Sequence, residues 1–346
     1  MKEHIASLSL TELQELLSQL GEQKWRAKQI FEGIYNGKSI SEITTISKEL
    51  KNKLLEKFED TLVKINVEKV GKDGTRKFVF LLSDGAMIEG VLMEYKYGRT
   101  ICISTQVGCR MGCKFCASGM NGLIRSLTAG EILSEVLVVN RLIGGTMTKR
   151  EITNIVLMGS GEPLDNYDNV SKFLKLVSSE DGINISQRNI SLSTCGLPNG
   201  IKKLIEDGFN INLTISLHAA NDEKRKKIMK VAEAVKIKEI LQECKAYFNK
   251  TGRRVIFEYA LIKDFNDSFE DAKELSTVLR GFPLHVNLIP LNHSYENGLD
   301  GTNRKQAYAF CDMLVSLGMS ATVRRTMGDD IGGACGQLRN SVASAT

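Results

Sequence analysis

Apolar residues recur at helical spacing three times within residues 1–60. Ser9 and Glu12 have the spacing of a capping box ahead of leucines that repeat every three or four positions. A second stretch of this kind covers 25–35, and Ser47 is placed to cap a third. The pattern predicts a small helical bundle. Such a bundle is either a packing cap for the rest of the fold or a module that positions RNA, and periodicity alone leaves both open.

From Leu62 onward the apolar residues alternate with polar ones, which is the spacing of half-buried strands. Turn-forming residues at 72–75 and 83–85 divide this region into three runs, and a fourth run follows at 99–105. Runs joined by such short turns pair in an antiparallel manner. The spacing therefore predicts a short antiparallel β extension after the helices.

Strand and helix patterns then alternate to residue 326, which requires parallel strands with right-handed crossovers. About six such units predict an α/β fold, a partial (β/α)6 barrel of the TIM type, with functional loops after the carboxyl ends of the strands. We expect four parts in the chain: a helical accessory domain at 1–60, the β extension at 61–98, the barrel at 99–326, and a C-terminal loop and tail at 327–346.

The composition is that of an ordinary globular protein, with 42% hydrophobic and 25% charged residues. No apolar run approaches the ~18 residues of a membrane span, and Glu3 and Glu12 stand where a secretory signal is apolar, so we expect a cytoplasmic protein. The net charge of +5 permits nucleic-acid binding without requiring it. Basic runs at 224–227 and 324–325 are candidates for phosphate contact, although such runs are usually the solvated ends of elements.

Three of the eight cysteines, Cys109, Cys113 and Cys116, fall within eight residues. Gly108 and Gly112 let the backbone curl closely around a small inorganic body. Thiolates suit iron–sulfur clusters or zinc, but structural zinc usually takes four protein ligands, and no nearby residue completes that set at zinc-finger spacing. The spacing therefore favours a four-iron cluster with one iron left open. Clustered cysteines also indicate a reducing compartment rather than a disulfide framework.

The segment 159–164 follows the strand predicted at 152–158 and contains two glycines. A dinucleotide-binding fingerprint needs a third glycine where Leu164 stands, so that interpretation is rejected. The glycines instead let the backbone approach a ligand, and Glu162 is placed to pair with an ammonium group of that ligand. Polar tips on successive barrel strands converge on one bound molecule. Such tips are found at Ser193, at Ser216-Leu217-His218 and at Asn292.

A glycine-rich stretch without a strand pattern covers 328–338, and we expect it to be mobile. Cys335 lies within this stretch, where a thiol is accessible as a nucleophile or redox partner. Taken singly, Cys102 is typical of a small buried strand residue and Glu89 of a solvent-facing one. The remaining cysteines are expected to be structural, namely Cys195, Cys244 and Cys311.

In combination, these stretches resemble the RlmN/Cfr family of radical SAM RNA methyltransferases over essentially the whole chain. The first helices are similar to the accessory RNA-binding domain of that family. Segment 161–164, with its proline, is nearer to the RlmN branch, which methylates adenine C2, than to Cfr enzymes, which prefer C8. The stretches that carry the resemblance are 102–109, 113–116, 161–164, 216–218, 328–330 and 334–338.

The resemblance implies a 4Fe–4S cluster held by Cys109, Cys113 and Cys116, with an open iron that binds S-adenosylmethionine (SAM). Two SAM molecules are used per turnover. One methylates Cys335, and the second is cleaved to a 5′-deoxyadenosyl radical that removes hydrogen from the new methyl group. The contacts with SAM are assigned by position to Gly161, Glu162, Ser193, Ser216, Leu217, His218 and Asn292.

The family chemistry also implies roles for two residues that the pattern alone does not mark. Once the carbon radical has added to adenine C2, Glu89 removes the C2 proton, and Cys102 attacks the sulfur of Cys335 to form a disulfide that reductants must reopen. Two departures lie near the site: Ser160 stands where the family usually has methionine, and 229–232 lacks the usual proline and asparagine. Neither departure removes a proposed catalytic group.

The resemblance further implies 23S rRNA and tRNA as substrates and a reductant such as flavodoxin or ferredoxin. We expect a monomer with no membrane partner. Two other interpretations remain at this point. A Cfr-like enzyme would methylate C8 of adenine in 23S rRNA, and a metal-binding RNA chaperone without catalytic activity would need no reactive Cys335.

Overall fold

The computed structural model describes residues 2–60, 62–291 and 299–338. In this part of the chain the centre of the molecule is a ten-stranded sheet. Its strands, in spatial order, are β1 (Lys64–Val70), β2 (Arg76–Leu81), β3 (Met87–Tyr95), β4 (Gly98–Ile103), β7 (Ile152–Leu157), β8 (Ile190–Thr194), β9 (Asn212–Ser216), β10 (Val255–Leu261), β11 (Leu284–Pro290) and β12 (Ala321–Val323).

The strands from β4 to β12 pair in parallel, which confirms the predicted α/β partial barrel. The antiparallel strands β1 to β3 are also as predicted, but they continue the same sheet through β3 and β4. In that pairing Val91 of β3 lies opposite Cys102 of β4, and Lys77 of β2 lies opposite Val91. The β extension therefore belongs to the wall of the barrel.

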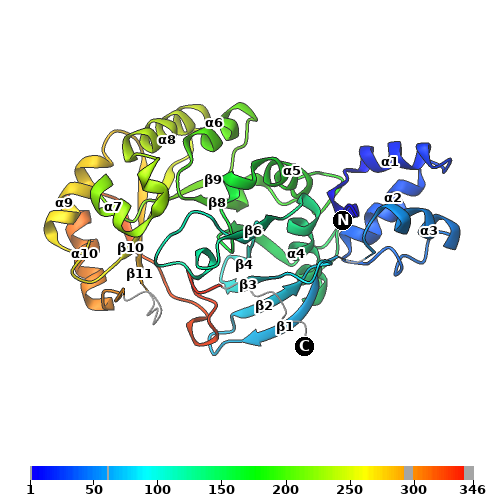
Figure 1. Ribbon diagram of the computed structural model, residues 1–346, viewed down its shortest axis with the longest axis horizontal. Coiled ribbons are helices and arrows are strands. Elements are labelled where there is room, and N and C mark those ends of the chain that lie inside the picture. The colour runs from blue at the N-terminus through cyan, green and yellow to red at the C-terminus, as the bar shows by residue number, and fades with distance from the viewer. Residues whose placement is uncertain (1, 61, 292–298, 339–346) are drawn as a thin grey trace.

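Helices cover the outer side of the curved sheet, and the three N-terminal helices lie at the end of the molecule remote from α9 and α10 (Figure 1). The predicted capping box of Ser9 with Glu12 is present, and Thr128 with Glu131 forms another one at the start of α4. The helices are α1 (Leu10–Gln19), α2 (Arg26–Tyr35), α3 (Lys48–Lys57), α4 (Ala129–Leu142), α5 (Tyr167–Val177), α6 (Pro198–Glu206), α7 (Asp222–Ile228), α8 (Ile237–Thr251), α9 (Phe269–Val278) and α10 (Arg304–Ser316).

A second, two-stranded sheet holds the cysteine-rich loop and was not predicted. Strand β5 (Gln106–Gly108) pairs with β6 (Leu123–Ser126) in an antiparallel manner. Gly108 ends β5 with a φ of +81°, and a Cβ at this position would lie 2.0 Å from the carbonyl oxygen of Gly122. The backbone can close the loop at this point only because residue 108 is glycine.

The N-terminal helices share one hydrophobic core with the barrel, which includes buried Ile34 of α2 and Leu137 of α4. A polar contact joins the two parts as well. His4 Nε2 lies 3.2 Å from the hydroxyl of Ser134 on α4, and Ser7 Oγ accepts a hydrogen bond of 2.9 Å from the Gly130 amide. No helix within the described residues is long and apolar enough to cross a bilayer.

Burial of His4 makes this junction sensitive to acid. Loss of solvation lowers the pKa of His4 from 6.5 to about 4. Because the unfolded chain takes up the proton first, stability should fall by up to about 3 kcal/mol as pH drops through this window. We expect His4→Gln, which cannot titrate, to show a shallower loss of stability between pH 6.5 and 4 in urea unfolding. Parallel curves for the two proteins would contradict this.

Candidate active site

The three predicted cluster ligands line one cavity at the carboxyl ends of the barrel strands, here called the cluster cavity. Cys109, Cys113 and Cys116 all contribute to its wall. Burial raises the pKa of Cys109 to about 12 and also raises that of Cys113, with further repulsion between the thiolates. Cysteines gathered at one cavity in this way can all bind as thiolates when a positively charged group lies between them, so the three fit an iron–sulfur cluster.

The wall of the cluster cavity contains more than the three cysteines. Among residues 2–60, 62–291 and 299–338, no group of three His, Cys, Asp or Glu side chains is arranged to hold a metal ion. The cavity wall instead brings the cysteines together with residues from several strand ends. Of the predicted SAM contacts, those in the wall are Gly161, Glu162, Ser193, Ser216 and His218.

One predicted SAM contact, Leu217, is not part of that wall. Leu217 is fully buried, and its amide donates a 3.0 Å hydrogen bond to the carbonyl of Glu258, so its side chain packs in the core. Asn292 lies outside the described residues. The prediction for these two residues therefore rests on the family resemblance.

Glu162 is fixed by the backbone that follows β7 and β8. Its carboxylate accepts hydrogen bonds from the amides of Cys195 at 2.8 Å and Leu164 at 3.0 Å. Burial raises its pKa against the lowering effect of these donors. Gly161 beside it has a φ of +108°, and a Cβ there would lie 2.7 Å from the Gln106 side chain. The segment can approach a ligand closely because it has no side chain at 161.

His218 is buried and neutral. Its Nδ1 accepts a 2.9 Å hydrogen bond from the amide of Ala260, and its ring meets the Phe115 ring edge-on at 4.7 Å. Burial, together with the charge of Arg225, lowers its pKa to about 3. The hydrogen-bond network assigns the proton to Nε2. His218 can therefore donate to a ligand but does not act as an acid near neutral pH.

The basic run at 224–227 is not a uniform phosphate-binding surface. Arg225 within it is fully buried. Its guanidinium donates to the carbonyls of Leu217 at 3.2 Å and Cys195 at 2.6 Å, which follow β9 and β8. Lys224 pairs with Asp271. Arg225 thus ties together the loops that carry the ligand-facing residues.

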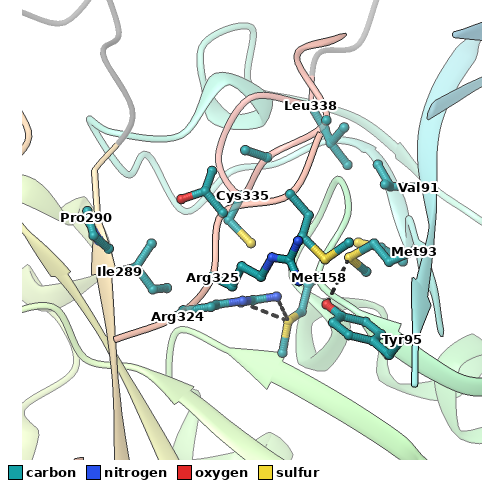
Figure 2. A pocket seen from close by; sticks show the side chains of 15 residues that line it. Val91, Met93, Tyr95, Met158, Ile289, Pro290, Arg324, Arg325, Cys335 and Leu338 are labelled. Atoms are coloured by element: carbon teal, nitrogen blue, oxygen red, sulfur yellow. Dashed lines mark hydrogen bonds between the residues drawn. The ribbon is translucent and has the colours of Figure 1, made fainter. Parts of the chain in front are cut away.

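A second cavity adjoins the first, and Cys335 lines both. This second one, here called the Cys335 cavity, also contains Cys102 in its wall. Figure 2 shows the Cys335 side chain pointing inward toward Arg324 and Met158. Burial raises the pKa of both thiols, and the charge of Arg324 lowers both. Two thiols predicted to react with each other thus meet at one cavity.

Glu258 is a functional candidate that the sequence pattern did not mark, and Arg324, which the pattern offered as a phosphate contact, instead pairs with Glu258 inside the barrel. Arg324 donates a 2.9 Å hydrogen bond to Glu258, and the nearby Cys335 thiolate is the main cause of its raised pKa. Glu258 also accepts from Ser193 at 3.2 Å, and the Ser193 and Ser216 hydroxyls lie 3.3 Å apart. This chain of contacts links the two cavities. The sequence feature that could have identified Glu258 is a single acidic residue inside the apolar strand Val255–Leu261.

Glu89 is not the solvent-facing residue that its strand pattern suggested. Its side chain is only 13% exposed and forms a 2.9 Å ion pair with Lys77 of β2. Because β2 to β4 are in register, Lys77, Val91 and Cys102 project from the same face of the sheet. Glu89 precedes Val91 by two residues and shares that face, so the fold places it on the side of the Cys335 cavity.

The C-terminal stretch lacks strands, as predicted, but it is anchored on both sides. From the β1–β2 side, the Gly328 amide donates to Asp73, Asp330 accepts from the Lys72 amide, and Lys77 donates to the Gly332 carbonyl, each at 2.9–3.0 Å. On the cysteine-loop side, the anchoring pairs are Ala117 with Gly336 and Ser118 with Leu338. Both anchors fix the position of the Cys335 loop.

Comparison with known proteins agrees with this geometry. Residues 103–275 match the model of the radical SAM superfamily, and 4–59 match the N-terminal domain of ribosomal RNA large subunit methyltransferases. A crystal structure of a radical SAM methyltransferase from Sphaerobacter thermophilus superposes with a TM-score of 0.92 at 40% identity, covering 97% of this chain and 99% of that one.

Curated relatives extend the match to nearly full length. A probable dual-specificity RNA methyltransferase RlmN from Clostridium perfringens (strain 13 / Type A) is 51% identical over 341 residues, 98% of this chain and 97% of that protein. One from Clostridium botulinum (strain Alaska E43 / Type E3) is 52% identical over 340 residues, 98% of this chain and 96% of that protein. The superfamily implies a 4Fe–4S cluster and SAM. The chain belongs to the RlmN family of dual-specificity RNA methyltransferases, within the radical SAM superfamily.

Proposed function

We propose that this enzyme methylates C2 of one adenosine in the peptidyl-transferase loop of 23S rRNA and C2 of the adenosine just 3′ of the tRNA anticodon. The observation that carries the proposal is the position of Cys335, whose side chain lines both the cavity of the cluster cysteines and the cavity of Cys102. The Cys335 sulfur can therefore receive a methyl group from the cluster cavity. The Cys102 thiol can attack the same sulfur from the Cys335 cavity and so release the product.

Cys109, Cys113 and Cys116 are proposed to hold the cluster through three sulfurs, with SAM at the remaining iron. When bound, the cluster and SAM supply the one-electron chemistry that activates a methyl group for an electron-poor carbon such as adenine C2. The chain's own residues orient SAM. Glu162 faces its ammonium group, and the Nε2 proton of His218 is available to an acceptor on the ligand. The other proposed contacts are Gly161, Ser193, Ser216, Leu217 and Asn292.

Cys335 is proposed to act first as a nucleophile. Its thiolate attacks the methyl carbon of one SAM molecule, so a sulfur–carbon bond forms, the sulfonium bond breaks, and S-adenosylhomocysteine leaves. The attack requires the ionised thiol, and the charge of Arg324 lowers the pKa of Cys335 toward that state. Glu258 holds the guanidinium of Arg324 in place.

Release of the product uses the remaining two residues. With the methyl carbon joined to both Cys335 and adenine C2, the Glu89 carboxylate would accept the C2 proton once the adduct has lost its one unpaired electron, for which a bound cluster would be the acceptor. The Cys102 thiolate then attacks the sulfur of Cys335, so a disulfide forms and the sulfur–carbon bond breaks. The electron pair of that bond stays with the product carbon, which takes up a proton. A two-electron reductant fed by flavodoxin or ferredoxin restores both thiols.

Mass spectrometry of RNA tests the substrate. In a strain that lacks the gene, 2-methyladenosine should disappear from both the 23S rRNA site and the tRNA site, and the wild-type gene should restore it. Unchanged 2-methyladenosine at both sites would falsify the proposal. Loss of 8-methyladenosine instead would favour the Cfr-like activity.

Cys335→Ala tests the role of the shared sulfur. We expect turnover to fall below detection, because among the described residues Cys335 is the only thiol that lines both cavities, as the two-step transfer requires. Cys244→Ala, at a fully buried helix position far from this chemistry in sequence, is the control and should keep most of its activity. If the protein were a metal-binding RNA chaperone, its function would be unchanged by Cys335→Ala.

Gly108→Ala tests the closed geometry of the cluster loop. The added methyl group would lie 2.0 Å from the Gly122 carbonyl, so the loop must shift and should retain much less iron after anaerobic reconstitution. Gly122→Ala is the matched control, since it also has a positive φ but no atom within 4 Å of the new Cβ. That variant should lose only about 1 kcal/mol of stability and keep its iron. Equal iron content in the two variants would contradict the prediction.

A further inference from the structure

We infer that Lys77 is a positioning residue that holds the proposed base Glu89 and the loop of Cys335 in one fixed relation. The inference rests on the proposed function. The Lys77 ammonium lies 2.9 Å from the Glu89 carboxylate and also donates a 2.9 Å hydrogen bond to the carbonyl of Gly332, three residues before Cys335. One side chain thus contacts both segments that the final step needs.

The register of the sheet puts Lys77 in this place. Lys77 pairs with Val91 on β3, and Val91 pairs with Cys102 on β4. Side chains opposite one another in adjacent strands share a face, and Glu89 is the diagonal neighbour of Lys77 on that face. The ammonium group therefore lies in the same row as Cys102 and next to Glu89.

The ion pair between Lys77 and Glu89 is largely buried. The side chains of Lys77 and Glu89 are 10% and 13% exposed, so neither charge is well solvated by water. The ion pair with Lys77 is a contact that fixes where the Glu89 carboxylate points, so its loss lets the carboxylate leave the position that the proton transfer needs. Loss of the Lys77 charge should therefore weaken the step that Glu89 performs.

In the final step, Glu89 and the Cys335 loop must act on the same adenine. When Glu89 takes the C2 proton, the adenine is still joined to Cys335 through the transferred carbon. The carboxylate and the loop must therefore hold one adenine between them. Of the contacts that hold the loop, those of Asp73 and Asp330 are hydrogen bonds with backbone amides. Lys77 donates to the loop backbone and also contacts the side chain of Glu89.

The test compares three variants of the full-length, reconstituted enzyme. Lys77→Met removes the charge and the hydrogen bond at similar length, Lys77→Gln keeps a donor without the charge, and Lys77→Arg keeps both. Arg76→Met is the matched control, because Arg76 directly precedes Lys77 on β2, faces the other side of the sheet and pairs with Glu68 at 2.6 Å. Iron content and thermal unfolding show which variants fold.

Two steps are measured separately. Intact-protein mass reports the methyl group on Cys335, which does not depend on Glu89, and denaturing gels report RNA that remains covalently bound. We expect Lys77→Met and Lys77→Gln to methylate Cys335 normally, to form methylated RNA at least ~10-fold more slowly at saturating RNA, and to accumulate bound RNA. Lys77→Arg should recover most of the rate, and Arg76→Met should match wild type.

A double-mutant cycle decides whether Lys77 acts through Glu89. Combining Lys77→Met with Glu89→Gln should slow product formation no further than Glu89→Gln alone, because the partner is already absent. Multiplying effects, or a normal rate for Lys77→Met in an active background, would overturn the inference. If wild type itself places no methyl group on Cys335 or RNA, it is the proposed function that fails. If Lys77→Met does not fold, Lys77→Gln supplies the same comparison.

Discussion

The pairing of β3 with β4 is the constraint on which the site depends. It joins the antiparallel strands to the parallel barrel and places Val91 opposite Cys102. Because side chains alternate between the two faces of a strand, a slip of one residue would turn Glu89 and Lys77 away from Cys102. The register is held by core residues on the other face, where Phe78, Phe80 and Ile88 are fully buried. Hydrophobic packing on one side of the sheet thus fixes the chemistry on the other.

Charges inside the barrel are tolerated because they are paired. Glu258 is only 5% exposed, and it accepts from both Arg324 and Ser193. An isolated carboxylate or guanidinium at such depth would be costly, but a hydrogen-bonded pair can persist and keep a charge near a reacting group. Arg324 accordingly acts on the sulfurs of Cys335 and Cys102, whose pKa values it lowers against the effect of burial.

Local pattern was enough to predict most elements and the gathering of Cys109, Cys113 and Cys116 at one place, because capping boxes, apolar periods and cysteine spacing act over a few residues. The burial of Glu89 was not predictable in this way, since it depends on which strand lies beside β3 and on Lys77 reaching across from β2. The burial of Arg225 was not predicted for the same reason. The carbonyl groups that accept its hydrogen bonds belong to loop residues 8 and 30 positions away in the sequence. The family resemblance predicted contacts between distant parts of the sequence only for residues that have a known role in the family.

The N-terminal helices were open to two interpretations, a packing cap or an RNA-positioning module, and the structure makes these compatible. Their core is continuous with that of the barrel, and His4 and Ser7 contact α4 directly. A unit joined through a shared core moves little relative to its partner, unlike one on a linker. Any RNA contact made by these helices is therefore at a fixed distance from Cys335. A rigid spacing of this kind can select RNAs by shape, because only a strand that reaches from one contact to the other presents its adenine to the sulfur.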